Sequence, residues 1–391
     1  MQRFNRRDFL RLAATLGGAA AASSALAACR GLVSEVAPSP TSTAEALAMN
    51  PTPRLDPTAT PNATPRPTVT RIATATATTA PTPTVTAAAE ALVGRVALVK
   101  TTDRAEGVRR AVGLLGLNPV RGRSVVLKPN FNSADPPPGS THLDTLRALL
   151  EQLWAMGARE ITIADRSGMG DTPKVMATLG VDRLAQELNA KLLAFDTLAA
   201  NEWVMVDAPD SHWKRGFHFA RPCLECDALV QTCNLKTHRF GGHFTLSLKN
   251  AVGMVARLRP GNSYNYMTEL HGSLHQRRMI AEINTAYTPA LVVMDGVEAF
   301  VNGGPDQGQK VAPGVVLAGT DRVALDAVGV ALLRLFGTTP EVSYGPIFGL
   351  QQLARAVELG LGVDAPQGMR FITDDAASAT YADRLREILL V

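Results

Sequence analysis

An abrupt change in composition near residue 92 limits which part of this chain can fold. Residues 37–89 consist almost entirely of Thr, Ala and Pro, and ten of the 25 prolines lie between Pro38 and Pro83. Such a segment has too little apolar surface to offset the conformational entropy that folding removes. We therefore expect a disordered Pro/Thr/Ala linker over residues 29–92. The globular part, residues 93–391, is long enough for one large domain or two closely packed lobes.

The first 28 residues have the pattern of an export signal. Arg6 and Arg7 are followed by Phe9 and Leu10, and then by a mildly apolar run that is shorter than a usual membrane span. Adjacent arginines before Phe-Leu resemble the twin-arginine signal, which delivers folded proteins to the twin-arginine export machinery. We predict a signal peptide over residues 1–28; the alternative is a chance Arg-Arg pair before a membrane anchor.

Cys29 is a candidate for lipidation. Residues 26–29 (Leu-Ala-Ala-Cys) resemble the lipobox of bacterial lipoproteins, in which the cysteine becomes the lipidated first residue. The alternative is ordinary cleavage after residues 25–27 (Ala-Leu-Ala). A lipid on Cys29 would tether the protein to the outer face of the bacterial cytoplasmic membrane, with the linker as a stalk. We expect an exported, membrane-tethered protein.

The formal net charge of +4 does not describe the globular part. Four arginines and one aspartate within residues 1–29 supply +3 of it, so the remainder of the chain is nearly neutral. A domain that binds nucleic acid needs a basic stripe, and one that binds single strands needs aromatic side chains, which are few here. Nucleic acid is therefore not an expected partner.

Beyond residue 92, short apolar runs alternate with amphipathic helical patterns. Strands are predicted over residues 95–100, 124–128, 161–164, 191–195, 227–232, 291–294 and 315–318. Helices are predicted over residues 104–115, 142–156, 173–179, 182–188, 244–255, 271–286 and 321–335, with two edge strands within 202–220 and a loop over 257–270. This alternation is typical of an α/β fold, a mostly parallel sheet covered by helices.

Residues 234–253, NLKTHRFGGHFTLSLKNAVG, hold the densest set of chemically versatile side chains. They follow a predicted strand, and open α/β sheets bind ligands at the carboxyl ends of their strands. Lys236 and His238 are two residues apart, so they point the same way in extended chain. Lysine supplies positive charge, and histidine a proton shuttle or a metal ligand. With Lys249 and Asn250 they are our predicted catalytic residues around a small anionic or metal-bearing ligand.

Further candidates for ligand binding lie near the ends of predicted strands. Gly241 and Gly242 precede a predicted helix, where free backbone N–H groups favour an anion. Five polar residues follow or end other strands, and would share one crevice if those strands are neighbours: Lys128, Asn130, Asn132, Asp165 and Asp295. For Lys128 and Asp165, a purely structural ion pair is the alternative.

Histidines form one candidate metal site. His271 and His275 are spaced by one turn of a predicted helix, so they would share a face, and His238 is a further ligand candidate. Many proteins exported by the twin-arginine route load a cofactor first. A transition metal such as nickel, zinc or iron is the cofactor that we consider.

Cysteines form a second candidate metal site. Cys223, Cys226 and Cys233 would need a fourth ligand such as His218 or His238. Two alternatives stand beside it: cysteine as a small core residue, and a disulfide between Cys223 and Cys226 outside the cell.

Asp326 is an unusual residue because it lies within an otherwise apolar helical pattern. An unpaired carboxylate there would be costly, so we expect a partner such as a lysine or buried backbone N–H groups. Asp321 is the expected N-cap of the same helix.

The order of several motifs resembles domain of unknown function family 362. The motifs are Lys-Pro-Asn at 128–130, Leu-Lys-Thr-His at 235–238, Leu-Lys-Asn-Ala-Val-Gly at 248–253, Asp-Gly at 295–296 and Gly-Gly-Pro at 303–305. The resemblance covers about residues 95–340. Some relatives carry ferredoxin-type iron–sulfur segments; this chain lacks that cysteine pattern, so the resemblance does not imply that cofactor.

A weaker resemblance is to the nickel-pincer lactate racemases, which place a histidine shortly before a cofactor-bearing lysine and another downstream. Here His238 precedes Lys249 by eleven residues and His271 lies further on, but the neighbouring glycines are spaced differently, which argues against covalent attachment at Lys249. The expected function is a cofactor- or metal-dependent enzyme for a small anionic substrate, either isomerase- or racemase-like or a redox enzyme. The alternatives are a non-catalytic ligand-binding lipoprotein and a polar cluster that only supports the fold.

Overall fold

The computed structural model describes residues 93–207 and 210–391. The export signal predicted over residues 1–28, lipidation at Cys29 and the linker predicted over 29–92 lie outside the described residues. Within them, no helix combines the length and the apolar character needed to cross a membrane.

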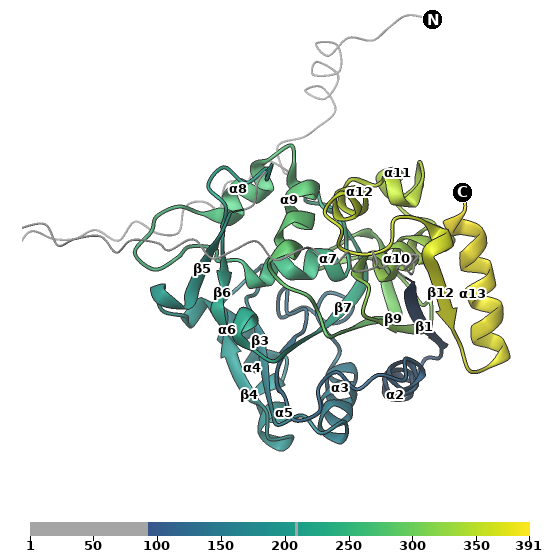
Figure 1. Cartoon of the computed structure of the whole chain (residues 1–391), viewed down its shortest axis with the longest axis horizontal. Helices are drawn as coiled ribbons and strands as arrows, with labels where there is room; N and C mark the ends of the chain where they lie inside the picture. The colour runs from purple at the N-terminus through teal and green to yellow at the C-terminus, as the bar shows by residue number, and fades with distance from the viewer. Residues whose placement is uncertain (1–92, 208–209) are drawn as a thin grey trace, which may run out of the picture. The chain divides into compact units, whose positions relative to one another are not determined.

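A ten-stranded sheet organises the described part of the chain (Figure 1). Its main path runs β12-β1-β11-β9-β7-β2-β3-β4, while β8 and β10 pair with β7 and β9. Strands β9, β7, β2, β3 and β4 are parallel to one another, and β11 runs antiparallel to both of its neighbours. A separate two-stranded sheet pairs β5 with β6. The prediction of a mostly parallel sheet covered by helices is confirmed.

The strands are β1 (Gly94–Lys100), β2 (Ser124–Lys128), β3 (Glu160–Asp165), β4 (Lys191–Ala194), β5 (Trp203–Val206), β6 (Phe217–Ala220), β7 (Ala228–His238), β8 (His243–Thr245), β9 (Leu291–Gly303), β10 (Gly308–Val311), β11 (Val315–Gly319) and β12 (Met369–Ile372). The helices are α2 (Arg104–Leu114), α3 (Leu143–Ala155), α4 (Thr172–Thr178), α5 (Val181–Glu187), α6 (Arg221–Glu225), α7 (Ser247–Asn250), α8 (Tyr266–Gly272), α9 (Gln276–Ile283), α10 (Arg322–Leu335), α11 (Pro340–Ser343), α12 (Gln351–Glu358) and α13 (Ala376–Leu389).

Helices cover both faces of the sheet because its strands are apolar on both sides. In β1, Val96 and Leu98 pack with residues of α10, α12 and α13, whereas Ala97 and Val99 pack with residues of α2 and α3. A third apolar cluster joins β2 and β7 to the small sheet and to α8 and α9. Burial on both faces is what a mostly parallel sheet requires.

Two strands extend beyond their predicted ends. β7 was expected to stop at residue 232 but continues to His238, and all eleven of its residues are buried. β9 continues past Asp295 to Gly303, and the register between the two strands shifts between Asn234 and Leu235. The continuations contain polar residues whose partners lie far away in sequence, so local hydrophobic periodicity does not reveal them.

Two predicted helices are wrong in their extent. Residues 244–255 form β8, then the short helix α7 and a 3₁₀ turn, rather than one helix. The helix predicted over residues 271–286 is broken, since α8 ends at Gly272 and α9 begins at Gln276. The Ser273 hydroxyl accepts a hydrogen bond from the backbone of His275, a side-chain turn that competes with helical pairing. Part of the predicted loop over 257–270 is helical in α8.

Candidate functional site

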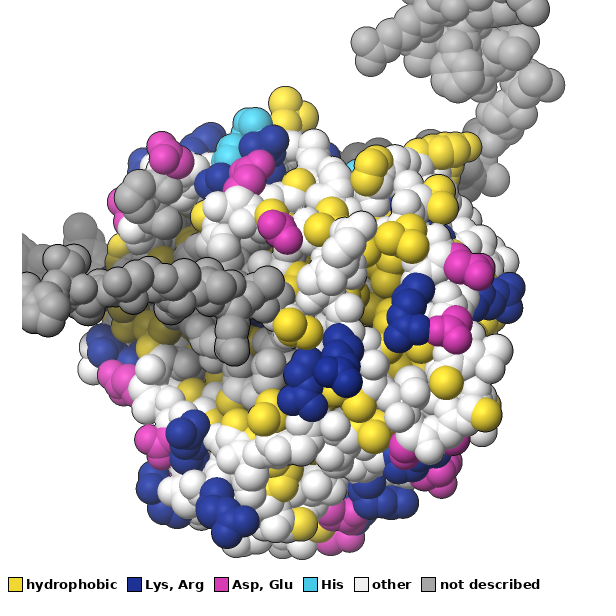
Figure 2. Space-filling view, turned by 45° about the vertical axis from the view of Figure 1, so that its right-hand side comes forward, with side chains coloured by type: hydrophobic (Ala, Val, Ile, Leu, Met, Phe, Trp, Pro, Cys, Tyr) yellow, Lys and Arg dark blue, Asp and Glu magenta, His cyan; other side chains and the backbone are white. Residues whose placement is uncertain are grey.

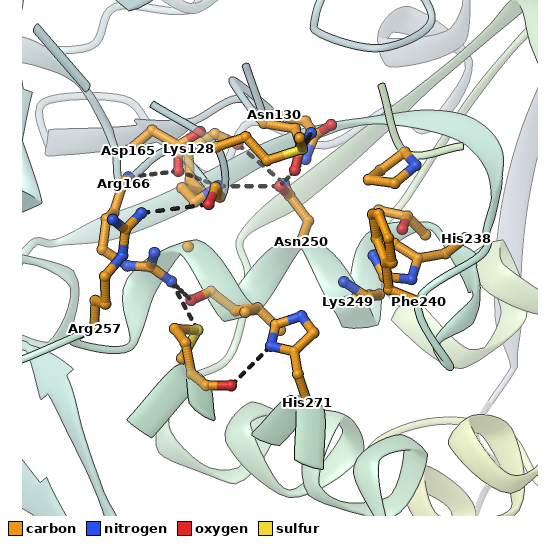
Figure 3. Close-up of a pocket in the computed structure, with 18 residues that line it drawn as sticks. Lys128, Asn130, Asp165, Arg166, His238, Phe240, Lys249, Asn250, Arg257 and His271 are labelled. Atoms are coloured by element: carbon orange, nitrogen blue, oxygen red, sulfur yellow. Dashed lines mark hydrogen bonds and ion pairs between the residues drawn. The ribbon is translucent and has the colours of Figure 1, made fainter. Parts of the chain in front are cut away.

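A cavity of about 330 Å³ lies where β2, β3 and β7 end (Figure 3). As neighbours in the sheet, β2 and β3 bring the two polar loops that follow them to the same cavity, as predicted. The remaining wall comes from the end of β7, the residues that follow it, α8 and Pro305. The residues that line the whole cavity are Lys128, Asn130, Asn132, Asp165, Arg166, Gly168, Met169, His238, Phe240, Thr245, Lys249, Asn250, Val252, Gly253, Arg257, Met267, His271 and Pro305.

Lys128 and Asp165 form a buried ion pair with an Nζ–Oδ1 distance of 2.7 Å. Asp165 also accepts hydrogen bonds from the backbone N–H groups of Phe131 and Arg166. Lys128 donates to the side chain of Asn250 at 3.0 Å, and burial lowers the pKa of the lysine even beside this carboxylate. Each group thus has most of its hydrogen-bonding capacity used within the protein, although both side chains also line the cavity.

Asn250 links this pair to the central strand. Its amide nitrogen donates to the carbonyl oxygen of Thr232 at 3.2 Å, and its oxygen accepts from Lys128 and, at 3.3 Å, from Asn130. The predicted residues Lys128, Asn130, Asp165 and Asn250 therefore do come together. Asn132 lies at the rim of the cavity, half-buried.

Lys249 differs from Lys128 because its ammonium group has no hydrogen-bond or ion-pair partner among residues 93–207 and 210–391. Its side chain is 8% exposed and lines the cavity. Burial and, to a smaller extent, the charge of Arg166 lower the pKa of Lys249 to about 8. An unpaired, partly desolvated cation of this kind is suited to a ligand anion.

Two histidines share the cavity with Lys249 (Figure 3). His238 is buried, and its Nδ1 has no hydrogen-bond partner in the described part of the chain. Burial, followed by the charge of Lys249, lowers the pKa of His238 well below its usual value. His271 is exposed at the mouth; partial desolvation and then Lys249 lower its pKa too, and its Nδ1 lies 2.8 Å from the carbonyl oxygen of Met267. Both imidazoles are therefore neutral near pH 7.

Sequence reasoning missed two arginines in the cavity wall. Arg166 is buried and donates to the carbonyl oxygens of Val252 at 2.9 Å and Val255 at 2.8 Å; burial lowers its pKa to about 10. Arg257 donates to the carbonyl oxygens of Ser167 and Gly168. Arg166 directly follows Asp165 at a strand end, which was a usable signal, whereas Arg257 lies in a segment predicted to be an ordinary loop.

Glycines permit the close packing around these groups. A Cβ at Gly253 would lie 2.4 Å from the Asp165 carboxylate and 2.8 Å from the Lys128 ammonium nitrogen. A Cβ at Gly242 would lie 2.8 Å from the Lys249 side chain and 2.9 Å from Nδ1 of His238. Gly242 thus lets β8 approach the site. Gly241 and Gly242 lie in the turn between β7 and β8, not at a helix start, so their predicted role as a helix-terminal anion site is wrong.

Lys236 and Asp295, two further predicted site residues, also lie outside the cavity wall. Lys236 is fully buried beneath it and donates to the carbonyl oxygens of Gly139 and Pro305, joining two loops; burial lowers its pKa to about 7. Asp295 forms an ion pair with Arg104 at 2.9 Å and accepts a hydrogen bond from Thr145. These partners lie far away in sequence, so their structural roles were not predicted.

The cysteines do not gather into one site. Cys233 packs in the apolar cluster beneath α10, whereas Cys223 packs in the cluster around the small sheet, and neither forms a disulfide with Cys226. His218, one of the two proposed fourth ligands, has its Nδ1 2.7 Å from the Tyr266 hydroxyl. In the described residues no group of three or more His, Cys, Asp or Glu side chains is placed to hold a metal ion. The core role of Cys223 and Cys233 explains their positions better than the cysteine metal site.

His275 lies apart from His271 because the predicted helix is broken between them. Its ring lies tilted against that of His212, with the centroids 4.5 Å apart. The predicted shared face of His271 and His275 is therefore wrong, and His238 is the histidine that joins His271 at the cavity.

The charges lining the cavity are unbalanced. Four cationic side chains face one carboxylate, Asp165, which already pairs with Lys128. By contrast, on the face shown in Figure 2, basic side chains are scattered among acidic and uncharged ones. The cavity can therefore attract an anion, and its neutral imidazoles can accept a proton from it or hold a metal.

Two known proteins are similar to parts of this chain. The thylakoid-associated protein sll1697 of Synechocystis sp. is 25% identical over 238 residues, which span 60% of this chain and 70% of that protein. The lactate racemase apoprotein from Thermoanaerobacterium thermosaccharolyticum aligns with a TM-score of 0.37 and 16% identity, over 54% of this chain and 51% of the racemase. Residues 125–331, more than half of the chain, match the family described as "Domain of unknown function (DUF362)", and the protein belongs to this family.

Proposed function

We propose that the protein binds a small organic anion in this cavity and transfers a proton to and from it, as an isomerase or racemase does. The observation that carries the proposal is Lys249, a cation without a protein partner in the described part of the chain, beside two neutral histidines. A bound carboxylate would satisfy the ammonium group and place its neighbouring carbon near the imidazoles.

The electrostatics of the cavity support acid–base chemistry on such a ligand. Removing a proton from the carbon beside a carboxylate builds up negative charge on that group, which preorganised cations stabilise. Lys249 supplies such a cation at the bound carboxylate. A neutral His238 or His271 would take the proton, and the protonated imidazole would return it.

A metal-bearing cofactor remains part of the proposal. His238 and His271 are the side chains that would hold a metal ion here, and Nδ1 of His238 has no hydrogen-bond partner among the described residues. A bound transition metal would supply Lewis-acid or redox chemistry. Because two histidines do not complete a metal site, the remaining ligands would come from a cofactor or the substrate.

Hydrogen exchange in D₂O tests the proposal. Incubated with chiral carboxylates bearing a hydroxyl, amino or methyl group on carbon 2, the protein is expected to replace the hydrogen on that carbon with deuterium, seen as loss of its proton NMR signal. His238→Gln and His271→Gln should each slow the exchange by about a hundredfold or more. His275→Gln, outside the cavity, is the matched control.

The outcomes of this experiment separate the proposed roles. Metal analysis of the same samples should find nickel, zinc or iron that is lost in His238→Gln if a metal takes part. Exchange that survives in both cavity variants would refute the catalytic role of the histidines.

A non-catalytic binding protein is the second candidate. Catalytic histidines are commonly oriented by a hydrogen bond to a carboxylate. Among the described residues, no carboxylate makes such a contact with His238 or His271, which favours this candidate. This candidate predicts anion binding that Lys249→Met abolishes, without any hydrogen exchange on carbon 2.

We also propose that the protein is exported by the twin-arginine machinery and tethered through a lipid on Cys29. Wild-type protein should appear in the membrane fraction, accessible to protease added outside the cell. Cys29→Ala should release it from the membrane, whereas Arg6→Lys/Arg7→Lys should leave it inside the cell. Membrane attachment that persists in Cys29→Ala would contradict the lipid anchor.

A further inference from the structure

Cations without carboxylate partners occur at two places in the cavity. Figure 3 shows Lys249 beside His238 and Phe240 on one side, and Arg257 beside Arg166 on the other. Arg257 is half-buried, and neither it nor Lys249 forms an ion pair with any residue that the structure describes. A monoanion bound at one of these places leaves the cation at the other without a counter-charge.

Arg257 keeps free hydrogen-bond donors. Its terminal nitrogen Nη2 donates to the carbonyl oxygens of Ser167 at 3.1 Å and Gly168 at 3.3 Å, which fixes the direction of the guanidinium group. Its Nε and Nη1 have no protein partner in the described ranges. A guanidinium with fixed direction and free N–H groups is suited to a planar carboxylate or to a phosphate.

Arg166 adds positive charge to the cavity but has few free N–H donors for a ligand. Its guanidinium donates to the carbonyl oxygens of Val252, Val255 and Ser167, so its donors are largely used. Its charge nevertheless acts on Lys249, whose pKa it lowers. The repulsion among these cations is relieved in proportion to the negative charge that a ligand brings.

The single carboxylate of the cavity does not balance these charges. Asp165 is bonded to Lys128, to the N–H of Phe131 and to the N–H of Arg166. A monoanion at Lys249 would leave Arg257 unpaired. The cavity volume of about 330 Å³ lies at the small end of ligand sites, so the ligand must be compact.

We propose that the ligand is a compact dianion with an acidic group at each end, one bound by Lys249 and the other by Arg257. The chemical class is a short dicarboxylate, or a carboxylate that carries a phosphate or sulfonate at its far end. This inference rests on the proposed function and names the substrate class of the same site.

Calorimetric titration with matched acids tests this inference. The full-length protein is titrated at constant ionic strength with butyrate and succinate, and with valerate and glutarate, pairs of equal chain length that differ by one carboxylate. We expect the better dicarboxylate to bind about tenfold to a hundredfold more tightly than its monocarboxylate. Arg257→Gln should remove that preference, and Arg257→Lys, which keeps the charge, should retain part of it.

Arg259→Gln is the matched control, because Arg259 lies two residues away and does not line the cavity. It should keep the wild-type preference, and circular dichroism should show that all variants are folded. Equal affinity for both members of each pair would overturn the dianion while leaving the proposed anion site intact. A preference that survives Arg257→Gln would overturn the assignment of the second acidic group to Arg257. Binding of none of the four acids at millimolar concentration would contradict both this inference and the proposed function.

Discussion

Replacing Lys249 with Met is expected to abolish anion binding and, in the same protein, to stabilise the unliganded fold. The ammonium group is buried without a partner in the described residues, and burial lowers its pKa from 10.5 to about 8. A shift of that size corresponds to about 3 kcal/mol of unfavourable charge burial at neutral pH. Methionine fills the same space without the charge, so the free energy of unfolding should rise by up to about 3 kcal/mol.

The pH dependence identifies the cause of that stabilisation. Between pH 8 and 10.5 the folded protein has released the Lys249 proton, whereas the unfolded chain still holds it. The unfolded state then binds more protons, so this lysine makes the free energy of unfolding rise with pH across that window. Urea unfolding at pH 7 and pH 10 measures the difference in free energy of unfolding between Lys249→Met and wild type. We expect this difference to be smaller at pH 10.

Lys191→Met is the control for this comparison, because Lys191 is exposed and paired with Glu160. It should change stability by less than about 1 kcal/mol at either pH. Two results would show that Lys249 has a partner in the folded protein. One is a Lys249→Met protein that is less stable than wild type; the other is a stability difference that does not depend on pH.

Asp165→Ala is expected to lower the free energy of unfolding by about 3–5 kcal/mol. The substitution leaves the Lys128 ammonium buried without its counter-charge, and removes the acceptor for the backbone N–H groups of Phe131 and Arg166. Unsatisfied buried donors add to the cost of the unpaired charge. Urea denaturation at pH 7 measures the loss, with Asp144→Ala, an exposed aspartate of α3, as the control.

The double variant Lys128→Met/Asp165→Ala distinguishes a broken pair from general damage. Removing both charges avoids the unpaired lysine, so the double variant should lose less stability than the two single variants together, by about 1–3 kcal/mol. Strict additivity would mean that the two side chains do not act as a pair.

The sequence predicted the half of the site that depends on strand ends. Lys128 and Asp165 end β2 and β3, and a parallel α/β sheet brings such ends together. His238 was found because it follows a predicted strand, and Lys249 because it lies in the same polar stretch, residues 234–253. Nothing local marked Arg257, since its role depends on the carbonyl groups of a loop ninety residues away in the chain.

Other parts of the site were not predictable because long-range partners decide them. Lys236 lies within strand β7 instead of following it. Its ammonium group donates hydrogen bonds to two loop carbonyl groups beneath the cavity. The expectation that Asp326 has a partner is confirmed. Its carboxylate accepts hydrogen bonds from the backbone N–H groups of Ser247 and Leu248 at the start of α7. The expectation of a partner followed from energetics, but only the fold shows that this contact holds the helix carrying Lys249.

Proton uptake on ligand binding tests most directly whether Lys249 holds an anion in this cavity. A bound carboxylate raises the pKa of the ammonium group above its value of about 8 in the empty cavity, so the protein must take up protons. Calorimetric titration with succinate at pH 8, in Tris and in Hepes, measures the uptake from the difference in heat. We predict about half a proton per succinate in the wild type and none in Lys249→Arg. Succinate binding without proton uptake, unchanged in Lys249→Met, would contradict the anion site.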